Sequence, residues 1–130
     1  MKTIDRYRWM ITAALCSLFT LTTAQLVSAQ METEIEHLLC YIETSGCSFN
    51  RNGTLHTSKE AGEHIRKKYA YAKRWIKTTQ DFIKYAATKS SISGKEYTVS
   101  CDGVEMPTAK WLEEELLRFR GDNLMMPKPG

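Results

Sequence analysis

The sequence predicts an α+β fold in which four helices pack on a small antiparallel sheet, formed by a hairpin and one later strand. Three observations lead to this class. Apolar residues recur at helical spacing in four stretches. Asn52-Gly53, the preferred pair for a tight hairpin turn, separates two short strand-like runs. Tyr97, Val99 and Cys101 alternate with polar residues, as in a half-buried strand. Because two strands alone are only marginally stable, we expect the later strand to pair with the hairpin.

Residues 1–29 have the pattern of a secretory signal peptide. A basic start at residues 2–8 leads into a mostly apolar run at residues 9–21, and the Val-Ser-Ala of residues 27–29 forms a small-x-small cleavage site. The apolar run is shorter than the ~20 residues of a membrane-spanning helix, which favours cleavage over an N-terminal anchor.

Cleavage would leave one small domain at residues 30–120 and a tail at residues 121–130, whose prolines and lack of periodicity predict disorder. The leader holds three of the 18 basic residues and one of the 15 acidic residues, so the rest of the chain is nearly neutral. We therefore expect a periplasmic or secreted protein that has no membrane span after cleavage and does not bind nucleic acid.

The first helix of the domain is predicted over about 31–44, where apolar residues recur at three- and four-residue spacing. Glu32, Glu34 and Glu36 fall in its expected first turns, where unpaired main-chain amides favour negative charge. We interpret these acids as helix-stabilising rather than as a metal site.

The second helix is predicted to start at Ser58, because Thr57 and Glu60 have the spacing of a capping box. It extends to about residue 75, and many basic residues lie on the side opposite its apolar face. This basic face would be exposed to solvent, bind a partner or pack against an acidic helix. A third helix is predicted from Thr78 or Thr79. A fourth is predicted after Pro107, with the acids of residues 113–115 in solvent.

Cys40, Cys47 and Cys101 remain after the leader, which permits one disulfide and one free thiol. Cys47 opens the hairpin that should pair with the strand of Cys101, so we predict the Cys47–Cys101 disulfide. Pairing of Cys40 with Cys47 stays open as the alternative, because sequence determines connectivity weakly.

A cluster of His56, Glu60, Glu63 and His64 suggests zinc binding or acid-base chemistry. The spacing disfavours both, because His56 precedes the helix and Glu60 is the expected capping partner. We assign no catalytic residue, no metal ligand and no cofactor, and we keep a small envelope hydrolase or metal-dependent enzyme using His56, Glu60 and His64 as the alternative function.

Four motifs follow one another along the chain: Phe49-x-Arg51-Asn52-Gly53-x-x-His56, Glu60-Ala61-x-x-His64-x-x-x-Lys68, Thr78-x-x-x-Phe82-Ile83 and Ser90-Ser91-x-Ser93-Gly94-x-x-Tyr97-x-Val99. Together they resemble an uncharacterised family of small exported bacterial proteins that includes YfeK. The resemblance covers nearly all of the chain after the leader and implies a periplasmic or secreted protein from a Gram-negative bacterium. It brings no activity, cofactor or functional residue.

One shorter likeness points elsewhere. Ser93-Gly94-x-x-Tyr97 is similar to a motif of periplasmic lysozyme inhibitors, which are β-barrels, and it covers only five residues. A lysozyme-inhibitor-like or immunity protein is therefore the weaker alternative.

The favoured hypothesis is a non-enzymatic domain that binds another protein or a cell-envelope component through the hairpin tip and the loop of residues 90–95. These polar, turn-forming segments are the least needed for a core, and binding residues concentrate on such loops. The candidate binding residues are Arg51, Asn52, His56, His64, Ser91, Ser93, Lys95 and Tyr97.

Overall fold

The computed structural model describes the backbone of residues 4–126 and the side chains of residues 23–126. The chain divides into two compact units, residues 1–32 and residues 33–130. The first unit contributes the helical backbone with which α1 (Ile4–Thr44) begins. Most of the predicted signal peptide precedes residue 23, where the described side chains begin, so the signal peptide stays a prediction. None of the helices among the described residues has both the length and the apolar character that a membrane span requires.

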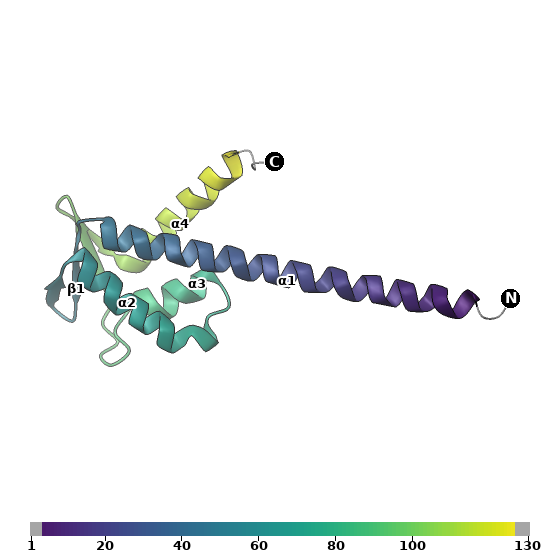
Figure 1. Ribbon diagram of the computed structural model, residues 1–130. Coiled ribbons are helices and arrows are strands. Elements are labelled where there is room, and N and C mark those ends of the chain that lie inside the picture. Colours follow the sequence, from purple (N-terminus) through teal and green to yellow (C-terminus); the bar gives the residue numbers. More distant parts are fainter. Residues whose placement is uncertain (1–3, 127–130) are drawn as a thin grey trace. The chain divides into compact units, whose positions relative to one another are not determined.

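The second unit has the predicted α+β class, with helices from several parts of the chain beside one antiparallel sheet (Figure 1). Its part of α1 starts at Thr33. The following elements are β1 (Ser48–Arg51), β2 (Thr54–His56), α2 (Ser58–Ala72), the 3-10 helix η1 (Lys73–Trp75), α3 (Thr79–Phe82), the π-helix η2 (Ile83–Ala87), β3 (Thr98–Cys101), β4 (Val104–Pro107) and α4 (Thr108–Met125).

The four strands lie in the order β2-β1-β3-β4, and every neighbouring pair is antiparallel. Asn52 and Gly53 both have positive φ, as the predicted hairpin turn requires, and β1 pairs with the later strand as expected. The sheet has one strand more than predicted. Asp102 and Gly103 also have positive φ and open a second hairpin. Its last residue, Pro107, is tolerated because β4 is an edge strand, where a missing amide breaks no ladder.

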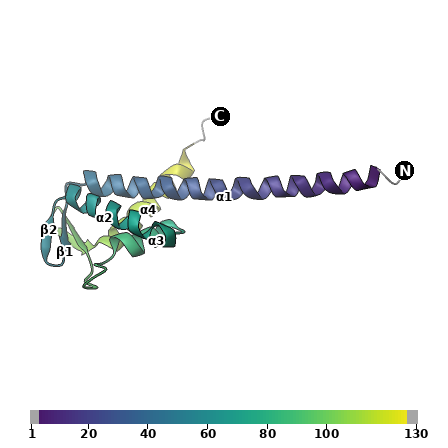
Figure 2. The ribbon, with the colours of Figure 1, turned by 60° about the horizontal axis from the view of Figure 1, so that its bottom comes forward.

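The core forms where α1 packs against the rest of the second unit. The apolar residues predicted for the first helix are at most 1% exposed. Figures 1 and 2 show α2 beside the end of α1, with the hairpin of β1 and β2 next to the start of α2. A Cβ added to Gly62 would overlap the Glu43 side chain, so glycine leaves room for that side chain between the two helices. The four apolar residues are Ile35, Leu38, Leu39 and Ile42.

Glu34 and Glu36 do not act as first-turn acids, because α1 begins far upstream of them. The Glu34 carboxylate is buried, where it accepts hydrogen bonds from the Thr79 hydroxyl and from Nε and Nη2 of Arg120. Glu36 instead forms an ion pair with Arg66 on α2. The acids therefore join helices to one another, and α1 covers part of the basic face predicted for α2.

Glu115 also differs from expectation, since it is buried on α4 rather than solvated. Its Oε1 lies 2.5 Å from Nε2 of His37, and Arg118 donates to both of its oxygens. Burial opposes ionisation, but the hydrogen bonds from Arg118 and His37 outweigh it and hold the pKa of Glu115 below its usual range. The helix continues to Met125, whereas we expected the ordered domain to end at Arg120. Residues 127–130 of the expected tail lie outside the described residues.

The predicted disulfide is confirmed. Cys47 and Cys101, 54 residues apart, are joined next to the paired ends of β1 and β3. Cys40 is exposed on α1 and carries a free thiol. The bond thus links the first hairpin to the second.

The buried ion pair gives the first prediction. Arg120→Ala should lower the free energy of unfolding by about 3 kcal/mol, because it removes the guanidinium that pairs with the buried Glu34 carboxylate. Urea denaturation measures the loss. Lys110→Ala on the same helix is the matched control and should cost less than about 0.5 kcal/mol, because its pair with Glu114 spans 4.0 Å and is exposed on both sides.

A double variant tests the cause. Adding Glu34→Gln to Arg120→Ala removes the buried negative charge that has lost the guanidinium and should recover part of the lost stability. Equal losses for Arg120→Ala and Lys110→Ala would contradict the assignment.

The disulfide gives the second prediction. Replacing Cys47 and Cys101 together with Ala should lower the free energy of unfolding by about 4 kcal/mol, since the bond shortens the unfolded chain across 54 residues. Calorimetric melting under non-reducing conditions checks it. Cys40→Ala should leave the melting temperature unchanged, and an equal drop for that variant would show that the effect is not due to the cross-link.

Candidate functional site

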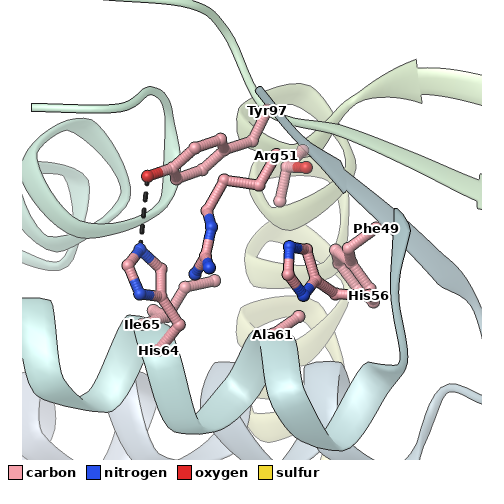
Figure 3. A pocket seen from close by; sticks show the side chains of 8 residues that line it. Phe49, Arg51, His56, Ala61, His64, Ile65 and Tyr97 are labelled. Carbon is pink, nitrogen blue, oxygen red and sulfur yellow. Dashed lines mark hydrogen bonds between the residues drawn. The ribbon is translucent and has the colours of Figure 1, made fainter. Parts of the chain in front are cut away.

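A small, partly open pocket lies between the first hairpin and the start of α2 (Figure 3). Its free volume is about 20 Å³, far below the several hundred Å³ of a typical small-molecule site. Four of the eight predicted binding residues line it, two from the hairpin, one from α2 and one just before β3. The full lining is Phe49, Arg51, His56, Ala61, His64, Ile65, Tyr97 and Thr108.

Local structure explains this gathering. Phe49 and Arg51 are two residues apart on β1 and therefore point to the same face of the sheet. His56 is the cross-strand partner of Phe49 and lies beside it on that face. On α2, Ala61 and His64 are three residues apart and share the helix face that meets the sheet. Alternate side chains of the strand thus face side chains that are three to four residues apart on the helix.

His64 is the most perturbed of the pocket's ionisable groups. Its Nε2 lies 3.3 Å from the Tyr97 hydroxyl, and the two rings meet edge to face. Burial, followed by the positive charges of Arg51 and Lys68, lowers the pKa of His64 to about 4. The imidazole is therefore neutral at pH 7, because burial and the nearby cations both disfavour its protonation.

Lys68 adds a positive charge beside the pocket. Its ammonium donates to the main-chain carbonyl of Lys89 at 2.6 Å and to the Tyr97 hydroxyl at 3.4 Å. Burial and the nearby Arg51 lower the pKa of Lys68, and burial raises the pKa of Tyr97. Lys68 was not among the predicted site residues. Its position four residues after His64, on the same helix face, could have predicted it as a site residue.

Arg51 supplies the guanidinium of the pocket. Figure 3 shows its side chain extending from β1 toward α2, between His56 and His64. Arg51 is half-buried, and no carboxylate among the described side chains forms an ion pair or a hydrogen bond with it. A guanidinium has five donors, and here an acidic partner is missing.

The acid expected beside the two histidines does not line the pocket. Oε2 of Glu60 accepts hydrogen bonds from the main-chain amide and the hydroxyl of Thr57, which completes the predicted capping box. These bonds, the amide first, hold the pKa of Glu60 below its usual range. Residues 23–126 hold no group of three His, Cys, Asp or Glu side chains placed to bind a metal ion. The geometry therefore brings His56 and His64 to one pocket without Glu60.

The hairpin tip and the loop of residues 90–95 form a second, neighbouring group. The Ser93 hydroxyl donates to the Asn52 side-chain carbonyl, and the Asn52 amide donates to the Ser90 hydroxyl at 3.4 Å. The same Ser90 oxygen accepts the main-chain amides of Ile92 and Ser93, which shapes the loop. The two segments that the sequence singled out are thus hydrogen-bonded into one surface.

Two predicted residues lie at the margins of this surface. Ser91 lines a shallow depression together with His64 and Lys68, next to the pocket. Lys95 is exposed and does not line the pocket, although its main-chain amide donates to the Ser93 hydroxyl. The eight predicted residues therefore belong to two adjoining groups rather than to one site.

Thr108 is the one polar residue among the four lining residues that sequence reasoning missed. It begins α4, is fully buried and lines the pocket, and among the described residues nothing hydrogen-bonds to its hydroxyl. A buried hydroxyl without a partner is rare in folded proteins. No local pattern marks it, because its position depends on how α4 packs under the sheet.

Comparison with known proteins places the chain in a family. Residues 29–120 match the family described as "Family of unknown function (DUF5329)". The chain belongs to this family. It is also similar to "Uncharacterized protein YfeK" of Salmonella typhimurium (strain LT2), with 34% identity over 89 residues, which cover 68% of this chain and 74% of that protein. No solved structure matches the chain significantly.

The family match agrees with the resemblance derived from the motifs. The likeness of Ser93-Gly94-x-x-Tyr97 to lysozyme inhibitors gains no support from the fold, since helices and a four-stranded sheet replace a β-barrel. Ser93 is instead bonded to the hairpin tip.

The environment of His64 gives the third prediction. Arg51→Gln should raise the pKa of His64 from about 4 toward 6.5, because it removes the strongest of the positive charges that disfavour protonation. An NMR titration of the imidazole protons measures it. Lys59→Gln on the same helix removes an exposed charge that does not act on His64, and should leave that pKa in place.

The same shift makes stability depend on pH. Since the pKa of His64 is lower in the folded state than in the unfolded chain, the unfolded state takes up the proton first as pH falls. The contribution of His64 is complete above about pH 6.5 and is lost progressively toward pH 4. His64→Gln should flatten this part of the stability profile, and an unchanged slope would contradict the assignment.

Proposed function

We propose that this protein is a non-enzymatic binding domain that is exported to the periplasm of a Gram-negative bacterium or secreted, and that it binds another protein or an envelope component. The partner would contact the surface made by the hairpin tip and the loop of residues 90–95. The hydrogen bond from Ser93 to Asn52, which joins these two turns across 41 residues of sequence, is the observation that carries the proposal.

Exposure of the loop supports a binding role. Ile92 is 100% exposed at its tip, flanked by the polar residues Ser91 and Ser93. An isolated exposed apolar residue is ordinary, but this one stands on a loop that Ser90 and Asn52 hold in a defined shape. A preordered loop loses little conformational freedom on binding, which favours recognition.

Export is supported by two independent features. The first 29 residues have the three-part pattern of a signal peptide, which we propose is removed after Ala29. The disulfide between Cys47 and Cys101 is compatible with an oxidising compartment. Neither feature depends on the binding surface, so the location and the binding role are separate parts of the proposal.

The fourth prediction tests the surface in intact cells. A photo-cross-linking amino acid at Ser91 should give a specific adduct in the native host, whereas the same group at Lys110 on α4 should give none. Ile92→Asp should abolish the Ser91 adduct at an unchanged melting temperature, because it places a charge at the centre of the contact.

Leu117→Asp is the matched control, since Leu117 is a large apolar residue that is 69% exposed on α4. It should leave the Ser91 adduct intact. Adducts of equal yield from Ser91 and Lys110, or a loss caused by both aspartate variants, would overturn the proposed surface.

A further inference from the structure

We propose that the pocket between the first hairpin and α2 is a receptor for a single carboxylate group on a short apolar stem, with Arg51 as its ionic partner. This inference rests on the proposed binding role and names the chemistry of what is bound. The carboxylate belongs to an acidic side chain or chain end of a protein partner, or to a small free organic acid.

Two cationic side chains at the pocket indicate that it binds an anion. Arg51 lies half-buried and has no acidic partner among the described side chains. Lys68 stands close by, and its ammonium is held by a main-chain carbonyl, so no carboxylate neutralises it. Two cations held near each other with little solvent favour an anion between them.

The charge of Glu60 also acts on this region, since it interacts electrostatically with His56 and Arg51. Its carboxylate stays with Thr57 at 2.8 and 3.0 Å, where it caps α2. It therefore offsets part of the positive charge from outside the pocket without occupying it.

The floor of the pocket selects the kind of anion. Phe49, Ala61 and Ile65 are all less than 9% exposed and present apolar surface. The buried Thr108 hydroxyl has a donor to offer and no partner among the described residues. A guanidinium fork and one hydroxyl suit a planar carboxylate, and the apolar floor suits a short hydrocarbon stem better than a phosphate. The free volume of about 20 Å³ limits what enters the pocket to one small chemical group.

The test is an NMR titration of the purified protein with propionate, with neutral propionamide and inorganic phosphate as comparison probes. Propionate should shift the amide signals of Arg51 and Ile65 and raise the pKa of His64. Burial and the positive charges of Arg51 and Lys68 hold that pKa low, and the added negative charge offsets the two charges. Propionamide and phosphate should bind at least about tenfold more weakly, as expected for loss of a charge-assisted hydrogen bond or of the apolar contact.

Two variants locate the site. Arg51→Gln should weaken propionate binding at least about tenfold, while Lys59→Gln, which removes an exposed cation outside the pocket, should not change it. Thr108→Val should also weaken propionate severalfold and yet raise the melting temperature, because it removes a buried hydroxyl that has no partner. These opposite signs separate ligand contact from a structural role.

Two further probes distinguish the sources of the carboxylate. A short peptide that ends in a free carboxylate, compared with its amidated form, tests the partner's chain end, and a peptide with an internal glutamate, compared with glutamine, tests its side chain. Preference for either acidic peptide assigns the site to a protein partner. Binding of propionate without either peptide assigns it to a free acid.

Propionamide or phosphate binding as tightly as propionate, or Arg51→Gln binding like the unchanged protein, would overturn the inference. Failure of the two proposals can be told apart. Loss of propionate binding with an intact Ser91 adduct removes only the carboxylate site. Propionate binding without any Ser91 adduct removes only the partner surface.

Discussion

The buried carboxylate of Glu34 is the point at which three helices of the folded unit meet. Removing a carboxylate from water is costly unless charged and hydrogen-bonding partners accompany it. Arg120 from α4 and Thr79 from the start of α3 supply them. Because these three residues come from distant parts of the chain, satisfying one charge positions two helices against α1. The fully buried Leu38, one turn along α1, then has neighbours on all sides.

At the other end of α1, the sheet is held by covalent and turn constraints. β1 lies between β2 and β3, tied to its neighbours by a tight turn on one side and by the Cys47–Cys101 bond on the other. A central strand with fixed neighbours holds its side chains in place. Phe49 and Arg51 therefore face α2 at a set register, and that register creates the pocket.

The capping of α2 has two consequences for this pocket. Thr57 starts the helix directly after β2, so that His64 arrives opposite Arg51 about two turns later. The cap also holds the Glu60 carboxylate outside the pocket, and no other carboxylate among the described side chains forms an ion pair with Arg51. His64 remains neutral there because a further positive charge in a half-buried site is unfavourable. One local motif thus sets both the geometry and the charge of the site.

The sequence by itself determined the features that depend on a few neighbouring residues: the Asn52-Gly53 turn, the cap at Thr57, the apolar stripe of α1 and the class of the fold. These are local because a positive φ or a capping hydrogen bond involves groups at most a few positions apart. Only the tertiary structure decided the burial of Glu34 and Glu115, whose partners Arg120 and His37 are 86 and 78 residues away. It also decided the fourth strand and, among the described residues, the lack of a hydrogen-bond partner for the Thr108 hydroxyl and of an ion-pair partner for Arg51. Each of these depends on which distant groups meet after packing, and no short pattern of residues records that outcome.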